Sequence, residues 1–227
     1  MATTVVFEEL FEMPLDIESL ADFRRWALSK DFPERGRIDF IGGRIEVDMS
    51  PEDLLTHGNL KTEIVGVLWA RVKAGGLGHL FTDRTRVSTP AADLSAEPDV
   101  VFVSEQSMDG AQVRLVPRTG GDDPERYAEL EGAPDLTVEI VNDSSSIKDT
   151  RRLPAAYFDA GVREFWLIDA RKEPLVFRIH KRGETAFEPA EADAEGFLTS
   201  GVFACRFRLD RNRDHRGHWR YDLFVKE

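Results

Sequence analysis

Residues 134–169, PDLTVEIVNDSSSIKDTRRLPAAYFDAGVREFWLID, contain the pattern that decides the fold. Apolar side chains stand at every second position from 136 to 140, which is the period of a strand with one apolar face, and Glu139 and Val141 share the other face. An amphipathic segment then runs through Tyr157 to Gly161, and a buried strand follows at 164–169. Strand, helix and strand in this order predict a parallel pair joined by a right-handed crossover.

Glu139 is costly to bury in the middle of a strand, so the sequence should supply something that compensates for it. An upstream segment, Glu97-Pro98-Asp99 followed by Val-Val-Phe-Val, places a second acid at the start of another apolar run. If the two strands pair with the acids about 5 Å apart, their repulsion is about 3 kcal/mol at an effective dielectric near 20. A proton would make one of them a candidate general acid, whereas a divalent metal would use both as oxygen ligands of the kind that Mg²⁺ prefers.

The composition is that of a globular chain with one large core. Of the 227 residues, 41% are apolar and 32% are charged, which favours a single domain spanning residues 1–227. Cys205 is the only cysteine and excludes an internal disulfide. The first residues lack a basic, apolar leader, and no run approaches the roughly 20 apolar residues of a membrane helix, so we expect a cytoplasmic protein with no membrane partner.

The formal charge of −12 opposes general binding of polyanions, because phosphates are neutralised by lysine and arginine gathered on one face. Two segments do gather basic residues, namely Lys148–Arg152 and Arg206–Arg220. Solvated charge that balances an acidic surface is the alternative interpretation of the second segment.

The N-terminal part predicts a helix, a hairpin and a second helix. Residues 16–30 have helical spacing with Asp16 as the N-cap, and residues 37–48 read as a hairpin around Gly42-Gly43. A helix beginning at Ser50-Pro51, with Ser50 as its cap, should run to about residue 74.

Two residues of this region have alternative roles. Asp39, in the first arm of the hairpin, is either an outward residue on an edge strand or part of the site. His57, in the second turn of the second helix, is either a surface or hydrogen-bonding residue or an accessory member of the site.

The rest of the chain predicts further strands. Short β segments are expected at 78–83 and 86–88, and a buried strand at 100–103. Residues 104–134 are rich in Gly, Asp, Glu and Pro, with Gly120-Gly121-Asp122-Asp123-Pro124 at their centre, and predict a long loop. Segments 175–180, 186–189 and 219–225 give a β-rich finish, so the core spans about 37–180 and a β-rich extension 181–227.

The order of these motifs resembles the PD-(D/E)XK nuclease superfamily, and most closely its Uma two branch of restriction-endonuclease-like proteins. The likeness covers roughly residues 37–180. It includes the hairpin, the helix histidine and the two Pro-Asp segments, with the following matching residues: Asp39-Phe40-Ile41-Gly42-Gly43, Met49-Ser50-Pro51, His57, Pro98-Asp99, Gly132-Ala133-Pro134-Asp135-Leu136, Glu139-Ile140-Val141, Tyr157, Gly161-Val162 and Glu164–Asp169.

The resemblance implies a restriction-endonuclease-like α/β core, a mixed central sheet flanked by helices. It implies that Asp99 and Glu139 bind Mg²⁺ or Mn²⁺, with Asp39 as an outer acid, and that the metal readies a water for attack on a phosphodiester of a nucleic acid, DNA above all. Many nucleases of this class act as dimers, so a homodimer is one possible assembly.

The chain departs from the family pattern at the lysine that assists catalysis. Val141 stands at the usual lysine position, and Leu153 stands where this branch has its helix lysine. Lys148 is the candidate catalytic replacement, and Arg151 and Arg152 are candidates for phosphate binding, because an arginine clamps phosphate but does not readily exchange a proton.

Three functions therefore remain open. The first is a metal-dependent endonuclease, the second is a nuclease-derived binding or oligomerisation module without turnover, and the third is an enzyme that uses the two carboxyls as an acid and base pair. The structural alternatives are a turn-capping role for Asp99 and, for Glu139, a buried salt bridge to Lys148 or Arg151.

Overall fold

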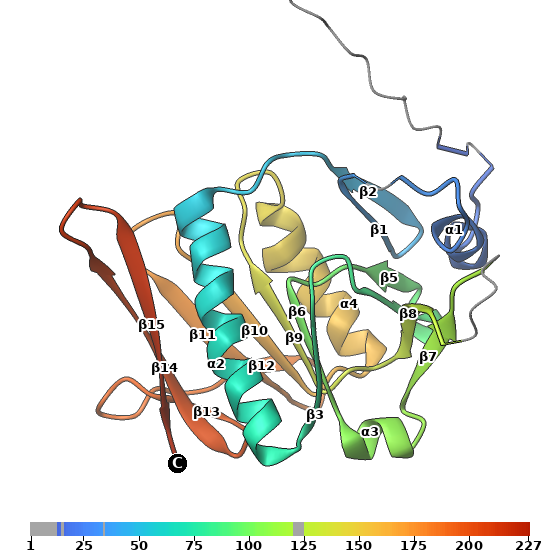
Figure 1. The fold of residues 1–227 in the computed structure, drawn as a ribbon. Coiled ribbons are helices and arrows are strands. Elements are labelled where there is room, and N and C mark those ends of the chain that lie inside the picture. Colours follow the sequence, from blue (N-terminus) through green and yellow to red (C-terminus); the bar gives the residue numbers. More distant parts are fainter. Residues whose placement is uncertain (1–12, 15, 34, 120–124) are drawn as a thin grey trace, which may run out of the picture.

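The computed structural model describes residues 13–14, 16–33, 35–119 and 125–227, and it arranges them in three sheets with helices between and around them (Figure 1). The central sheet has the order β12-β11-β10-β9-β6-β3, the outer sheet β2-β1-β5-β4-β8-β7, and the C-terminal sheet β13-β14-β15. The central strands are β3 (Gly78–Thr82), β6 (Val100–Ser104), β9 (Leu136–Ile140), β10 (Glu164–Asp169), β11 (Val176–Arg182) and β12 (Phe187–Pro189). The other strands are β1 (Arg37–Ile41), β2 (Arg44–Asp48), β4 (Arg86–Thr89), β5 (Leu94–Ala96), β7 (Val113–Pro117), β8 (Tyr127–Gly132), β13 (Leu198–Ser200), β14 (Cys205–Arg213) and β15 (Trp219–Lys226).

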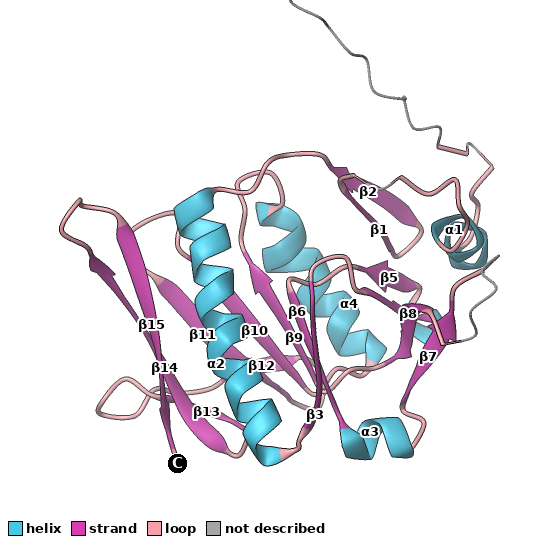
Figure 2. Ribbon diagram, viewed as in Figure 1, coloured by secondary structure: helices cyan, strands magenta, loops and turns pink. Residues whose placement is uncertain are grey.

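The central sheet is mixed, as the sequence predicts. β9 and β10 are parallel and are joined by helix α4 (Leu153–Ala160), whereas β6 and β11 run antiparallel to their neighbours. Every residue of β9 is buried, because both faces of the central sheet are covered (Figure 2). The mixed α/β architecture of the prediction is confirmed.

Each face of the central sheet has its own cover. Helix α2 (Asn59–Gly75) packs the apolar stripe Leu60, Ile64, Leu68 and Val72 on one face, together with residues of the C-terminal sheet. Helix α4 packs against the opposite face, between the central sheet and residues of the outer sheet. The first face has an uninterrupted apolar core, so polar side chains of β9 are directed to the second.

The hairpin at residues 37–48 is confirmed, but its position in the sheet was not foreseen. Gly42 and Gly43 take φ values of +53° and +75°, the left-handed conformation that a tight hairpin turn needs. β1 lies between β2 and β5 rather than at an edge. The edge-strand interpretation of Asp39 is therefore wrong, and only 1% of this residue is exposed.

Two predicted helix starts are wrong. The first helix, α1 (Leu20–Ala27), is shorter than 16–30 and is capped by Ser19, whose hydroxyl accepts from the Asp22 N–H. The second begins after Asp53, whose carboxylate accepts from the N–H groups of Leu55 at 3.0 Å and Thr56 at 2.6 Å. A carboxylate that satisfies two free donors outcompetes the Ser50 hydroxyl, so the chain enters a π-helical turn, η1 (Leu54–Gly58), before α2.

The predicted long loop at 104–134 is also wrong for most of its length. It contains helix α3 (Glu105–Asp109) and the antiparallel pair β7–β8, and the segment Gly120–Pro124 at its centre lies outside the described residues. Val113 and Leu130 of this pair pack with Val87 and Val101, so burial of alternate apolar residues outweighs the polar composition. Strands β13 and β14 and the short 3₁₀ turn η2 (Pro90–Ala92) were not predicted.

No helix in the described part of the chain is both long and apolar enough to cross a membrane.

Candidate active site

Asp99 and Glu139 are brought together by the antiparallel pairing of β6 with β9. Val100 lies opposite Val138 in this pairing. Asp99, which precedes Val100, therefore lies beside Glu139, which follows Val138. Neither acid is exposed. The Asp99 Oδ2 atom accepts the Ile140 N–H at 2.7 Å, so the carboxylate is fixed to the neighbouring strand.

Arg37, the first residue of β1, reaches both acids. Its guanidinium donates to Asp99 Oδ1 at 2.7 Å and lies 3.9 Å from Glu139 Oε2. Glu139 Oε1 accepts the Tyr157 hydroxyl of α4 at 2.5 Å, but its Oε2 atom is buried without a hydrogen-bond partner. The salt bridge to Lys148 or Arg151 that we considered for Glu139 is absent among the described contacts, and Tyr157 takes its place.

The two acids have opposite protonation tendencies. Burial would raise the pKa of Asp99, but Arg37 and His57 outweigh it and hold this pKa far below its usual range. Burial raises the pKa of Glu139 well above its usual value, and the neighbouring Asp99 charge adds to the effect. The surroundings therefore favour the charged form of Asp99 and the protonated form of Glu139.

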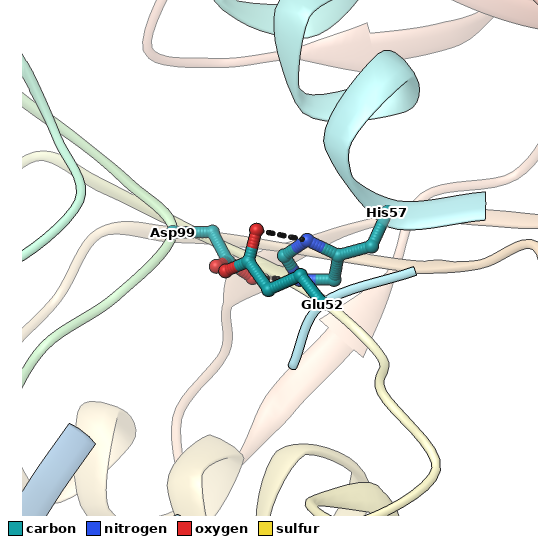
Figure 3. Close-up of side chains that lie close together, drawn as sticks. All are labelled: Glu52, His57 and Asp99. Carbon is teal, nitrogen blue, oxygen red and sulfur yellow. Dashed lines mark ion pairs between the residues drawn. The ribbon is translucent and has the colours of Figure 1, made fainter. Parts of the chain in front are cut away.

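Glu52 and His57, from the segment that leads into α2, lie next to Asp99 (Figure 3). His57 of η1 lies between two acids, with Nδ1 3.1 Å from Glu52 and Nε2 3.5 Å from Asp99 Oδ2. The Lys61 Nζ atom lies 3.3 Å from Asp99, 2.9 Å from Glu52 and 2.6 Å from Asp83. Asp99 thus has three basic side chains around it, which accounts for its low pKa.

The side chains of Glu52, His57 and Asp99 each offer an atom within 4.8 Å of the others, a spacing that could hold a metal ion. Burial lowers the pKa of His57, but the adjacent Asp99 and Glu52 carboxylates outweigh it and raise this pKa to about 9. The adjacent His57 imidazole, together with Lys61, lowers the pKa of Glu52 to about 2. At neutral pH the imidazole is protonated, and it has to lose that proton before it can bind a metal.

Asp39 and Lys148 form a second buried pair beside the acids. Lys148 lies in η3 (Lys148–Arg152), the π-helical turn that leads into α4, and donates to Asp39 Oδ2 at 2.6 Å. Asp39 Oδ1 accepts the Glu97 N–H at 3.0 Å. Lys148 is 5% exposed, and its pKa is raised because the Asp39 carboxylate outweighs burial.

Asp149 is a further buried acid of this region. Burial raises its pKa to about 6, although Ser145 donates a hydrogen bond to it and Lys148 is close. Its Oδ1 atom has no hydrogen-bond partner.

Arg151 and Arg152 are not brought to the two acids. Arg151 is exposed, and Arg152 donates to Glu46 of β2 at 2.8 Å. Arg152 and Lys148 do line one hollow of about 360 Å³, next to Asp48 and Ser144–Ser145. A neighbouring hollow of about 290 Å³, which we call the cleft, is lined by Arg37, Glu52, His57, Asp83, Arg84, Glu97 and Asn142, among others. Arg37 and His57 connect the cleft to Asp99.

This constellation agrees with the comparison with known families. The model of the Uma2 family, described as "Putative restriction endonuclease", matches residues 20–209. The chain belongs to the Uma2 family. The predicted resemblance is thereby confirmed.

Uma2 membership also agrees with the likeness to a solved structure. A crystal structure described as a "putative nuclease belonging to DUF820" from Anabaena variabilis ATCC 29413 superposes with a TM-score of 0.60 at 21% sequence identity. The match covers 82% of this chain and 90% of that one, and at this identity it supports the fold. No curated protein matches the chain.

Sequence reasoning missed several members of this Uma2 site. Arg37, Lys61 and Tyr157 were not predicted as site residues, and Glu52 was assigned only to a helix start. Lys61 follows His57 by four positions, so the two share one helical face, and this spacing could have linked them. Arg37 left no such signal, because only the sheet order brings β1 to the start of β6.

Proposed function

We propose that this Uma2 protein is a divalent-metal-dependent endonuclease that hydrolyses phosphodiester bonds of DNA. The observation that carries the proposal is the pairing of β6 with β9, which sets Asp99 and Glu139 side by side with one buried oxygen, Glu139 Oε2, that makes no hydrogen bond. Family membership supports a nuclease-like activity, and the two carboxyls supply the chemistry that such an activity needs.

The donor set fits Mg²⁺ or Mn²⁺. Both ions favour carboxylate oxygens. Burial and repulsion by Asp99 favour the protonated form of Glu139, so a cation is needed for both carboxyls to be charged. The alternative set of Glu52, His57 and Asp99 suits these ions less well, because Mg²⁺ and Mn²⁺ favour oxygen ligands over an imidazole nitrogen. When bound, the ion activates a water and offsets charge on the leaving oxygen.

The Arg37 guanidinium competes with a metal ion for Asp99 and Glu139. Its guanidinium takes one Asp99 oxygen and lies close to the free Glu139 oxygen, so an ion at these atoms competes with it. Arg37→Met should therefore strengthen Mn²⁺ binding, whereas Arg37→Lys should restore the competition in part. Weaker Mn²⁺ binding by Arg37→Met would place the ion elsewhere.

Lys148 is the proposed replacement for the helix lysine. Leu153, at the family position, is 1% exposed and packs in the α4 core, so it contributes no charge. Lys148 lies on the preceding turn and pairs with Asp39 beside the acids. Lys148→Ala should reduce cleavage more than Arg152→Ala, because only a lysine readily exchanges a proton at this place. Equal losses would assign both residues to phosphate binding.

The second candidate is a binding module without turnover. Leu153 favours it, because the lysine of the family pattern is replaced by a side chain that serves the core. A protein of this kind would bind DNA and would leave it intact with every divalent ion.

The deciding experiment combines cleavage with stability. DNA should be nicked or cut with Mg²⁺ or Mn²⁺ by the parent, and by neither Asp99→Asn nor Glu139→Gln. Mn²⁺ should also raise the Tm of the parent by binding the folded state, and the rise should be lost in both variants. If a variant that carries both substitutions cuts DNA at the parent's rate, the activity belongs to a contaminant or to another site. An unchanged Tm at millimolar Mn²⁺ would contradict the metal site.

A further inference from the structure

The loop that joins β14 to β15 and the strand ends next to it carry a concentration of basic residues in a chain of net charge −12. We call residues 211–220 the hairpin tip. Its charged and imidazole side chains are Arg211, Arg213, Asp214, His215, Arg216, His218 and Arg220. The proposed nuclease mechanism uses none of them.

Three arginines of the hairpin tip form no salt bridge with the acids of the described ranges. Arg206 and Arg208, nearer the start of β14, pair with Asp193 at 2.9 Å and Asp210 at 3.0 Å, respectively. Arg213, Arg216 and Arg220 are exposed, and none forms a salt bridge within the described part of the chain. Their charge is therefore available to a partner outside this chain.

The hairpin tip is held in a defined conformation. The Asp214 carboxylate accepts the N–H groups of Arg216 at 2.8 Å and His218 at 2.9 Å, so this acid builds the turn. The Trp219 ring has the guanidinium groups of Arg211 and Arg213 at 4.0 Å and 3.7 Å from its centre. Arg213 also donates to the Gly217 carbonyl at 2.5 Å. Fixed guanidinium groups lose little freedom on binding an anion.

The hairpin tip lies at the end of the molecule where the site opens. Asn59, the first residue of α2, donates its side-chain N–H to the Trp219 carbonyl at 3.3 Å, and His57 lies two residues before it. On its other side Arg211 donates to the Ala170 carbonyl at 2.8 Å, just past the end of β10 and beside the strand of Glu139. Figure 1 shows the β14–β15 turn at the same end as the start of α2.

We propose that the hairpin tip binds the phosphate backbone of a DNA duplex whose scissile strand enters the cleft. This inference rests on the proposed function and adds to it a second, non-catalytic contact. Arginine forks match phosphate geometry, and contacts of this kind position a duplex without reading its sequence. A local basic contact also explains how a chain of net charge −12 approaches a polyanion.

The salt dependence of binding measures the contact. Each phosphate neutralised adds about 0.9 to the slope of log affinity against log salt. Removing Arg213, Arg216 and Arg220 together should therefore flatten this slope by about 2 to 3 and lower the affinity about tenfold or more at low salt.

The test uses the full chain, a labelled DNA duplex and EDTA, so that binding is measured without cleavage. The tip variant is Arg213→Ala with Arg216→Ala and Arg220→Ala, and a rescue variant carries lysine at the same three positions. The matched control removes the same charge from exposed residues elsewhere, with Lys30→Ala, Lys73→Ala and Arg178→Ala. We expect weaker binding with a flatter salt dependence by the tip variant, and binding near the parent's by the rescue and control variants.

Several outcomes overturn the inference, and they are separable from failure of the proposed function. Equal affinity and slope for the tip variant and the parent overturn the tip contact and leave nuclease activity intact. Equal losses in the tip and control variants, no binding by the parent, or tip-dependent binding to anionic lipid vesicles in place of DNA also overturn it. Tip-dependent DNA binding without cleavage in any divalent ion upholds the contact and removes the proposed function.

Discussion

Charged side chains are arranged in opposite ways in the acid cluster, formed by Asp39, Asp99 and Glu139, and in the hairpin tip. Around Asp99 every basic side chain faces a carboxylate, and the acids themselves are buried. At the hairpin tip Arg213, Arg216 and Arg220 are exposed, whereas the Asp214 carboxylate accepts backbone N–H groups. Buried charges have to be compensated within the chain, whereas exposed ones cost little and remain available to a partner. The comparison predicts large stability effects in the first region and small ones in the second.

Asp99→Ala should give the largest effect. It leaves Arg37, Lys61 and His57 without their shared acid in a buried place, which costs about 3–5 kcal/mol of unfolding free energy. Urea unfolding measures the loss. Asp143→Ala is the control, because its side chain is 89% exposed and pairs only with Arg171 at the surface. Equal midpoints for the two variants would show that the charges around Asp99 are not compensated by it.

Glu139→Gln should behave differently from Asp99→Asn within the same cluster. Because burial and Asp99 raise the pKa of Glu139, its carboxyl is neutral in the folded protein, and glutamine should change the unfolding free energy by less than about 1 kcal/mol. In the unfolded chain Glu139 ionises near its ordinary pKa, so the parent loses stability as pH rises above that value. The Gln variant should lack this loss.

Unfolding curves recorded from mildly acidic to neutral pH test the difference. If the parent and Glu139→Gln show the same dependence on pH, Glu139 is ionised in the folded protein.

The next largest effect should be the pKa shift of His57. Asp99 and Glu52 outweigh burial and raise this pKa to about 9. His180, on β11, should titrate below the usual histidine range, because burial lowers its pKa and no acid is near enough to reverse this among its described contacts. The stabilisation from charged His57 is complete below its unfolded pKa of about 6.5 and is lost as pH rises through about 9.

NMR titration of the two imidazoles measures both values. Glu52→Gln should lower the His57 pKa and leave that of His180 unchanged. Titration of His57 near its ordinary value in the parent would contradict the contacts shown in Figure 3.

Substitutions at the hairpin tip should have the smallest effects on stability. Arg216→Ala and Arg220→Ala should each change the unfolding free energy by less than about 0.5 kcal/mol, because both side chains are exposed and unpaired within the described chain. Urea unfolding at low and high salt measures this. A loss comparable to that of Asp99→Ala would mean that these arginines serve the fold.

Local patterns predicted much of the fold and only part of the site. The alternation around Glu139 and the glycine at the end of α4 report on neighbouring residues, so β9, α4 and β10 could be predicted from the sequence. The helix starts at Ser19 and Asp53 and the β7–β8 pair depended on competition between caps and on burial against distant strands, which the sequence does not display.

The same limit applies to the site. Asp99, Glu139, Asp39 and His57 lie together in the structure, whereas Arg151 and Arg152 point elsewhere. The role of each remains a prediction for the variants above. Arg37 and Lys61 became visible only with the order of the strands, because a side chain that reaches across sheets leaves no periodic signal in its own segment.

The contacts of the acid cluster join distant parts of the chain. Arg37 and Asp99 are 62 positions apart, Asp99 and Ile140 are 41 apart, and Asp39 and Lys148 are 109 apart. Contacts between such distant residues form late in folding, because long loops must close first. A chain whose synthesis has not yet reached residue 139 lacks both β9 and η3, so the cluster around Asp99 can assemble only after most of the core has been made.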